Sequence, residues 1–213
     1  MIGATIAKNE RSCYSGAMLK GARTKGAILD HATGLASQVG LAGLTIGVLA
    51  DDLNLSKSGL FAHFRSKESL QIEVLNHAAE RFRETVVRPA LQEPRGAPRI
   101  RALFELWRTW ARDPALPGGC VFVAATAELD DRPGPVRERL VELQRDWVTT
   151  IALSFQKGVE AGLFRMDIDP AQLAQDLYGI MLSYHLHTRL LGDAGAEARA
   201  HRAFDRMLED IEV

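Results

Sequence analysis

Apolar residues recur every three or four positions through most of the chain, and no segment shows the strict alternation typical of a half-buried β-strand. Between residues 44 and 67 this pattern predicts two short amphipathic helices joined by a tight turn. Thr45 and Ser56 are suitable N-cap residues, because a hydroxyl can accept a hydrogen bond from a free backbone N–H at a helix start. Asn54 tolerates the left-handed backbone that the turn requires, and Leu55 is expected to pack beneath it. This layout predicts a helix-turn-helix.

The second short helix is predicted to have a small, polar and basic side opposite an apolar side. Such a helix fits the DNA major groove, where a protein needs little bulk near the base edges and donors for phosphates and purine acceptors. We therefore expect this helix to read DNA. The residues that can project on its polar side are Lys57, Ser58, Gly59, Ala62 and His63.

The rest of the chain is predicted to be helical, which makes the protein all-α. The breaks between the helices fall at clusters of proline and glycine, and Pro89 is expected to end the first of these helices. The predicted helices cover residues 67–88, 98–112, 120–130, 136–161, 170–191 and 197–211.

The pattern divides the chain into three parts. Residues 1–23 show no clear periodicity and are expected to form a flexible arm, with Met18 as an alternative start to Met1. Residues 24–66 would form a three-helix DNA-binding domain. Residues 67–213 would form a larger helical domain for ligand binding and dimerisation.

Charge is distributed unevenly along the chain. The formal net charge of the 213 residues is −1, yet residues 1–68 carry a net charge of +3 and the remainder is net negative. Positive charge near the motif is what the release of counterions from DNA requires. The charge distribution therefore supports a nucleic-acid partner.

The composition of the chain limits the cellular compartment and the kinds of binding site that we expect. Cys13 and Cys120 lie far apart, so we expect no disulfide framework and a reducing cytoplasm. The chain has no apolar run that could span a membrane and no secretory signal, so no membrane partner is expected. His185 and His187 lie two apart and would point away from each other on a helix, so no metal site is expected there. We also expect no cofactor.

The residues 44–70, LTIGVLADDLNLSKSGLFAHFRSKESL, resemble the DNA-binding segment of the tetracycline-repressor (TetR) family of bacterial transcription regulators. The resemblance extends upstream through residues 24–40 and covers about the first third of the chain. Residues 119–140 are more weakly similar to the regulatory domain of one branch of the family. The buried stripe expected of the supporting first helix consists of Ile28, Leu29, Ala32, Leu35, Ala36 and Val39.

The resemblance implies a set of DNA-facing residues, and two positions depart from the family pattern. Phe61 stands where many members have a tyrosine whose hydroxyl reaches a phosphate, and Gly47 has no side chain with which to read a base. Lys67 lies in the first turn of a helix, where free N–H groups and the positive dipole end also favour a phosphate. The candidate DNA contacts are Thr45, Ser56, Lys57, Ser58, Gly59, His63 and Lys67.

The resemblance also implies a small-molecule effector held among the middle helices, whose binding would change the spacing of two DNA readers. The aromatic residues of these helices suit a hydrophobic or aromatic compound, although apolar side chains at helical spacing are also ordinary core. The candidate lining residues are Phe104, Trp107, Trp110, Cys120, Phe122, Trp147, Tyr178, Tyr184 and His185.

The last two helices of TetR-family proteins pair with their copies in a second subunit. A twofold dimer would present two readers to a palindromic double-stranded operator. The alternative is that the apolar stripes of these helices face the chain's own core. The candidate interface residues are Ile180, Tyr184, Thr188, Phe204, Met207 and Leu208.

The function that fits these expectations is a ligand-responsive, DNA-binding transcription regulator, in its simplest form a homodimeric repressor. The alternatives are an effector-independent regulator, a helical dimeric adaptor and an all-helical enzyme. The enzyme is disfavoured because the sequence has no GxSxG, P-loop or HExxH motif. The adaptor would leave the basic face of the motif unexplained.

Overall fold

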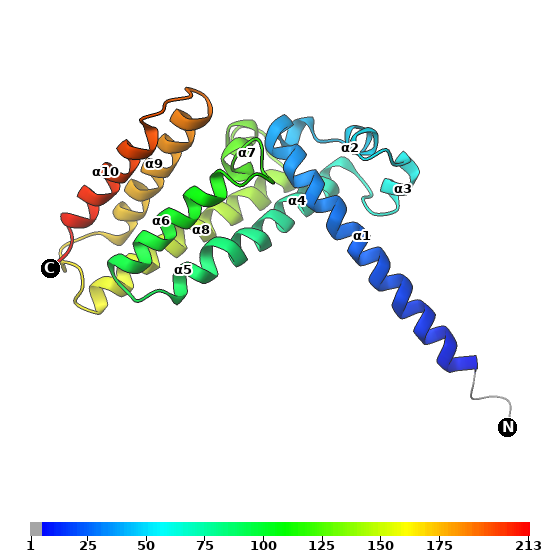
Figure 1. Cartoon of the computed structure of the whole chain (residues 1–213), viewed down its shortest axis with the longest axis horizontal. Coiled ribbons are helices and arrows are strands. Elements are labelled where there is room, and N and C mark those ends of the chain that lie inside the picture. Colours follow the sequence, from blue (N-terminus) through cyan, green and yellow to red (C-terminus); the bar gives the residue numbers. More distant parts are fainter. Residues whose placement is uncertain (1–5) are drawn as a thin grey trace.

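The computed structural model describes the backbone of residues 6–213 and the side chains from residue 25 on, and the described chain is built from helices. Figure 1 shows α2 and α3 at one end of the molecule, with the antiparallel α9 and α10 at the opposite end. An isolated β-bridge joins Phe164 to Glu212 near the carboxyl end. The predicted all-α fold is confirmed.

The DNA-binding end consists of α1 (Ile6–Gly43), α2 (Ile46–Asp52) and α3 (Lys57–Phe61). Gly40 adopts φ 75° and kinks the end of α1, which is a backbone conformation that a residue with a Cβ rarely adopts. Of the arm expected over residues 1–23, residues 1–5 lie outside the described range, and the backbone from Ile6 on belongs to α1. The flexibility of the arm stays a prediction.

The connection to the larger domain is longer than the sequence predicts. It runs through α4 (Lys67–Phe82), a π-helical turn η1 (Arg83–Val87) and α5 (Arg88–Gln92). Pro89 does not end the helix: it occupies the first turn of α5, where its missing N–H breaks no bond within that helix. The wider π turn just before it accommodates a residue that cannot donate to the preceding turn.

The larger domain contains α6 (Ala97–Ala111), α7 (Val121–Leu129), α8 (Pro135–Glu160), α9 (Pro170–Arg189) and α10 (Ala196–Glu209). These bounds agree closely with the ranges predicted from periodicity. α9 packs between α8 and α10, and α7 packs against α1 as well as α8. α7 therefore touches both the larger domain and the DNA-binding end.

Two residues expected in the core are instead exposed. Val39 is 45% exposed because it lies on the outer side of α1 beside the Gly40 kink. Leu55 is also 45% exposed, so it does not pack beneath the turn between α2 and α3. The apolar residues that are fully buried after the turn are Leu60 and Phe64.

Among the residues that the structure describes, no helix is long and apolar enough to cross a membrane.

Candidate functional site

The helix-turn-helix is held by caps at both of its helix starts. The Thr45 hydroxyl accepts a hydrogen bond from the Val48 N–H at 3.1 Å, and the Ser56 hydroxyl accepts one from the Gly59 N–H at 3.1 Å. Asn54 between them has φ 51°, as the sharp turn requires. Both caps and the turn residue were predicted from the sequence, and the structure confirms them.

The polar side of α3 is open to solvent. Ser56, Lys57, Ser58 and Gly59 are exposed, whereas His63 is half-buried beside Phe64. The end of the Lys57 side chain lies over Gly47, where an added Cβ would sit 3.6 Å from Lys57 Cε. Gly47 thus leaves room for Lys57 instead of contributing a side chain of its own.

Lys67 differs from the residues of this surface because its side chain is bonded to another helix. Its ammonium group donates to the backbone carbonyl of Ala42 at the kinked end of α1. Gln71, one turn further along α4, donates to the neighbouring carbonyl of Leu41. Lys67 therefore also joins α4 to α1, a structural role that the sequence did not indicate.

A mainly apolar cavity of about 150 Å³, partly open to solvent, lies among α4, η1, α6, α7, α8 and α9. Five of the nine predicted effector residues line it. They are Trp107, Cys120, Phe122, Trp147 and Tyr178. The structure thus brings together residues that are up to 71 positions apart in the sequence.

The other four predicted effector residues do not line this cavity. Phe104 stacks on Phe204 of α10, with ring centroids 4.4 Å apart. Tyr184 packs against the buried guanidinium of Arg108, and His185 lies beside Gly119. Trp110 backs the cavity wall, because its ring stacks on Phe122 from outside the lining.

Phe82 is a cavity residue that sequence analysis placed on the apolar face of its helix without assigning it to a site. Its ring meets Trp147 edge-on at 4.9 Å, and it makes similar contacts with Phe122 and Trp110. Gln144 and Arg83 also line the cavity. No sequence signal singles them out, because helix packing decides which polar residues reach the cavity.

Burial sets the ionisation of the polar groups in the lining. The Tyr178 hydroxyl donates to Gln144 Oε1 at 2.8 Å, and burial raises the pKa of this phenol well above its usual range. Burial likewise raises the pKa of the Cys120 thiol, which stays protonated and unreactive at neutral pH. The lining is therefore uncharged at these two positions.

Both ends of α7 are fastened to the carboxyl end of α1. In the loop just before α7, the Gly118 N–H donates to the Ser37 hydroxyl at 2.9 Å, and a Cβ on Gly118 would overlap the Ser37 carbonyl. At its other end, Glu128 accepts from the Ala42 N–H at 2.7 Å. Because Cys120 and Phe122 at the start of α7 also line the cavity, this helix directly joins the cavity to the DNA-binding end.

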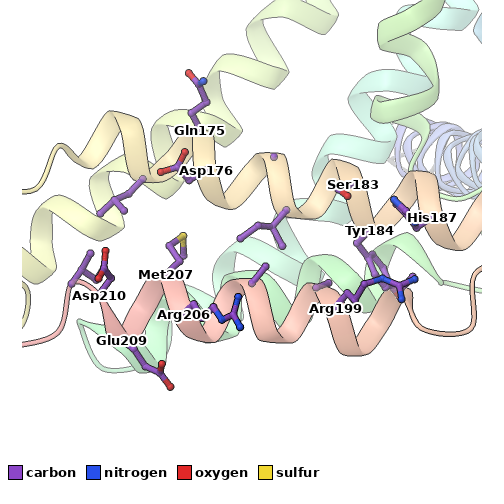
Figure 2. Close-up of a pocket in the computed structure, with 17 residues that line it drawn as sticks. Gln175, Asp176, Ser183, Tyr184, His187, Arg199, Arg206, Met207, Glu209 and Asp210 are labelled. Atoms are coloured by element: carbon purple, nitrogen blue, oxygen red, sulfur yellow. The ribbon is translucent and has the colours of Figure 1, made fainter.

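An open groove of about 1270 Å³ runs between α9 and α10 on the face away from the cavity. Figure 2 shows Asp176, Ser183 and His187 along α9 facing Arg199, Arg206 and Met207 along α10. Ile180 and Met207, two of the predicted interface residues, lie in this groove.

Three predicted interface residues belong to the chain's own core, which corrects the sequence analysis. Phe204 is 0% exposed, and Tyr184 and Leu208 are each 2% exposed. Tyr184 touches the floor of the groove, whereas Phe204 and Leu208 do not line it. Thr188 is half-buried and donates its hydroxyl to the Tyr184 carbonyl at 2.8 Å.

An apolar stripe on α9 was missed. Leu182, Leu186 and Leu190 recur every four residues, so they lie on one face of the helix, and they are 39%, 48% and 76% exposed. Helical periodicity located the buried stripe of α9 but did not single out these leucines as a second one.

Family models match most of the chain. The model described as "Bacterial regulatory proteins, tetR family" matches residues 28–74, and the model described as "Tetracyclin repressor-like, C-terminal domain" matches residues 96–204. The chain belongs to the TetR family. It is a DNA-binding transcription regulator, and the predicted family and function class are confirmed. Since regulators of this family are not enzymes, the prediction of a non-enzyme is confirmed as well.

Solved structures of other proteins share this fold. A regulator from Chloroflexus aurantiacus is 27% identical, with 91% of this chain and 98% of that chain covered and a TM-score of 0.80. AibR, solved with isovaleryl coenzyme A and operator DNA, is 23% identical over 76% of this chain and 85% of its own, with a TM-score of 0.64. A regulator from Saccharomonospora viridis, solved with choline, is 21% identical over 90% and 99%, with a TM-score of 0.76. No curated protein sequence matched the chain significantly.

Proposed function

We propose that this TetR regulator is a homodimeric repressor that leaves its operator when a small hydrophobic or aromatic effector fills the cavity. The observation that carries the proposal is the position of α7. One end of this helix lines the cavity, and both its carboxyl end and the loop just before it are bonded to α1. A ligand that shifts α7 would therefore move the DNA-binding end.

The DNA contacts would be made by the amino-terminal half of α3. Ser56, Lys57, Ser58 and Gly59 are exposed there, and Thr45 fixes the preceding helix through its cap. Small residues allow α3 to approach the base edges, and Lys57 can neutralise a phosphate. His63 would contact the DNA backbone from the edge of this surface, and Lys67 would do so by exchanging its bond to the Ala42 carbonyl for a phosphate.

The dimer would form through the faces of α9 and α10 that the single chain leaves open. Ile180 and Met207 lie in the groove, and the leucine stripe on another side of α9, whose Leu182 faces α7 and α8, supplies further exposed apolar surface. Such a face is what a four-helix interface between two copies requires. The twofold axis would then place two α3 helices on the two half-sites of a palindromic operator.

An effector is supported by the cavity and by the relatives of known structure. AibR was solved with isovaleryl coenzyme A and operator DNA, and the Saccharomonospora viridis regulator with choline. These two compounds differ greatly in chemistry, so they do not indicate which effector this chain would bind. Release needs the effector to favour the non-binding conformation by a few kcal/mol. A protein that acts on chromosomal operators would reside in the cytoplasm.

The proposal is tested by binding of the purified protein to a labelled duplex from its own upstream region. The titration is repeated with random competitor DNA and over a series of salt concentrations. Specific retention that weakens steeply with salt is expected, because phosphate contacts release counterions. If no duplex, including those from a random library, is retained above competitor at any salt, the operator-binding proposal fails.

A further inference from the structure

We infer that Phe61 recognises thymine, and that its ring covers the C5-methyl group of one thymine in each half-site of the operator. The inference rests on the proposed function, because it requires α3 to enter the major groove. It deepens that function by naming a base that the helix selects. Phe61 is not among the DNA contacts that the sequence predicted.

The side chain of Phe61 is held out from the reading helix. Its neighbours Leu60 and Phe64 are both 0% exposed and anchor this segment to the core, whereas Phe61 is 52% exposed. It is the only exposed Phe, Trp or Tyr among the residues whose side chains are described. A single exposed apolar side chain is ordinary on a protein surface, so what matters is its place on α3.

The position of Phe61 keeps its ring within the major groove. α3 has 5 residues, so it is about 7.5 Å long, whereas the groove is about 12 Å wide. A residue at the end of so short a helix does not lie beyond the groove. Helical side chains also lean toward the amino terminus, which directs the ring of Phe61 back over the turn that carries Lys57 and Ser58. This is the turn proposed to approach the base edges.

The residues beside Phe61 leave its ring free to touch a base. Ser58, Gly59 and Ala62 are exposed as well, and all three have small side chains or none. The ring of Phe61 therefore protrudes further from this part of α3 than the side chains of its neighbours do. A surface that meets DNA here brings the phenyl ring into contact with it.

The chemistry of the groove decides what a phenyl ring can contact. The C5-methyl of thymine is the apolar group that base pairs present in the major groove, beside hydrogen-bond donors and acceptors. Phe61 has no hydroxyl, so it cannot donate to a phosphate as a tyrosine can. Contact between the ring and the methyl group removes apolar surface of both partners from water. This contact favours thymine over a base that lacks the methyl group.

Replacing thymine by deoxyuridine tests the inference, because it removes the methyl group and keeps the hydrogen-bonding edge of the base. The probe is the operator duplex retained in the binding assay, with deoxyuridine at one pair of symmetry-related thymines at a time. Dissociation constants for the full-length protein are measured by fluorescence anisotropy. We expect one such pair to weaken binding by about fourfold per half-site, the factor for burying one methyl-sized group.

Phe61→Ala tests whether this side chain causes the effect. The variant should bind the unmodified operator more weakly, and deoxyuridine should cause no further loss. Because Phe61 is more than half exposed, the variant should stay folded. Val48→Ala is the matched control, since Val48 is a 41% exposed apolar residue on α2, outside the reading helix. It should keep the fourfold loss with deoxyuridine.

Phe61→Tyr separates base recognition from a contact with the DNA backbone. A tyrosine keeps the ring, so the variant should retain the fourfold loss with deoxyuridine. If the ring instead faced the backbone, the added hydroxyl would strengthen binding by donating to a phosphate, and deoxyuridine would have no effect in any of the proteins. That result would overturn the inference.

The remaining outcomes separate this inference from the proposed function. An equal loss with deoxyuridine in the unmodified protein and in Phe61→Ala would assign the methyl contact to another residue and overturn the inference. If deoxyuridine has no effect while Lys57→Ala still weakens binding, α3 remains the reading helix and only the role of Phe61 fails. If no duplex is retained at any salt concentration, operator binding fails and the inference fails with it.

Discussion

The two ends of the molecule leave different kinds of surface uncovered. The α2–α3 end exposes small polar residues and Lys57 together with the apolar Val48, Leu55 and Phe61, and its helix starts are held by Thr45 and Ser56. The α9–α10 end exposes a leucine stripe on α9 and, on another side of that helix, a long groove. A surface of small polar and basic residues suits a hydrated, anionic partner, whereas an exposed apolar stripe suits another protein surface. The contrast separates DNA reading from dimerisation within one chain.

The packing of α7 against α1, which connects the two ends, should be disrupted most severely by Gly118→Ala. The new Cβ would overlap the backbone carbonyl of Ser37, so α1 and α7 would have to separate. We expect a loss of about 3 kcal/mol or more in unfolding free energy, measured by denaturant titration. Gly26→Ala is the control, since nothing lies within 4 Å of its Cβ position and alanine favours the helix. Equal stability of the two variants would show that α1 and α7 are not packed as described.

The apolar end is tested by Leu186→Glu. A carboxylate in the middle of the exposed leucine stripe should prevent association of two copies, because burying an unpaired charge is costly. Analytical ultracentrifugation should show a dimer for the unmodified protein and a monomer for the variant. Leu91→Glu, at a similarly exposed leucine on α5, should remain dimeric. A dimeric Leu186→Glu protein would place the interface elsewhere.

Glu128→Ala should loosen the carboxyl end of α7 from α1 without disturbing the helix-turn-helix of α2 and α3. The carboxylate bonded to the Ala42 N–H is lost, and we expect a cost of about 2 kcal/mol, as for a hydrogen bond to a charged group. Hydrogen exchange of the Ala42 amide should accelerate, whereas the Val48 amide, which Thr45 caps, should be unaffected. Unchanged exchange at Ala42 would contradict the proposed connection.

At the polar end, Thr45→Ala removes the side-chain cap of α2. The Val48 N–H then loses its acceptor, and we expect a loss of about 1 kcal/mol in unfolding free energy. Thr45→Ser should restore most of this stability, because serine supplies the same hydroxyl. Thermal unfolding of the three proteins provides the measurement. An alanine variant as stable as the parent would contradict the claim that the Thr45 hydroxyl stabilises the start of α2.

His185 provides the smallest expected effect. Burial, followed by the nearby Arg189, lowers its pKa below the usual 6.5. The unfolded chain therefore takes up a proton before the folded protein does, so the stabilising effect of the neutral ring is complete above about pH 6.5 and is lost as the pH falls through the lowered pKa. The stability difference between the parent and His185→Gln should shift against the parent between about pH 7.5 and about pH 5.5. If this stability difference did not change with pH, the lowered pKa of His185 would be contradicted.

Local features were predictable from the sequence because their causes lie within a few residues. The caps at Thr45 and Ser56 and the left-handed Asn54 depend on their immediate neighbours. The helix bounds followed from periodicity in the same way. Pro89 is the exception, since the π turn before it allows the helix to continue in a new segment.

The site could be predicted only in part, because periodicity shows which face of a helix is buried but not what covers it. Phe104 and Trp107 lie one turn apart on α6, and both are buried. Trp107 reaches the cavity, whereas Phe104 stacks on Phe204 of α10. The same limit explains why Phe204 was mistaken for an interface residue.

The central claim, that the exposed side of α3 binds DNA, is tested most directly by the salt dependence of operator binding in paired lysine variants. Lys57→Ala removes a base on α3, and Lys157→Ala removes one on α8 that is paired with Glu160. The account predicts that Lys57→Ala binds the operator more weakly and with a salt slope lower by about 1, while Lys157→Ala matches the unmodified protein. Equal affinity and equal slope for all three proteins would contradict it.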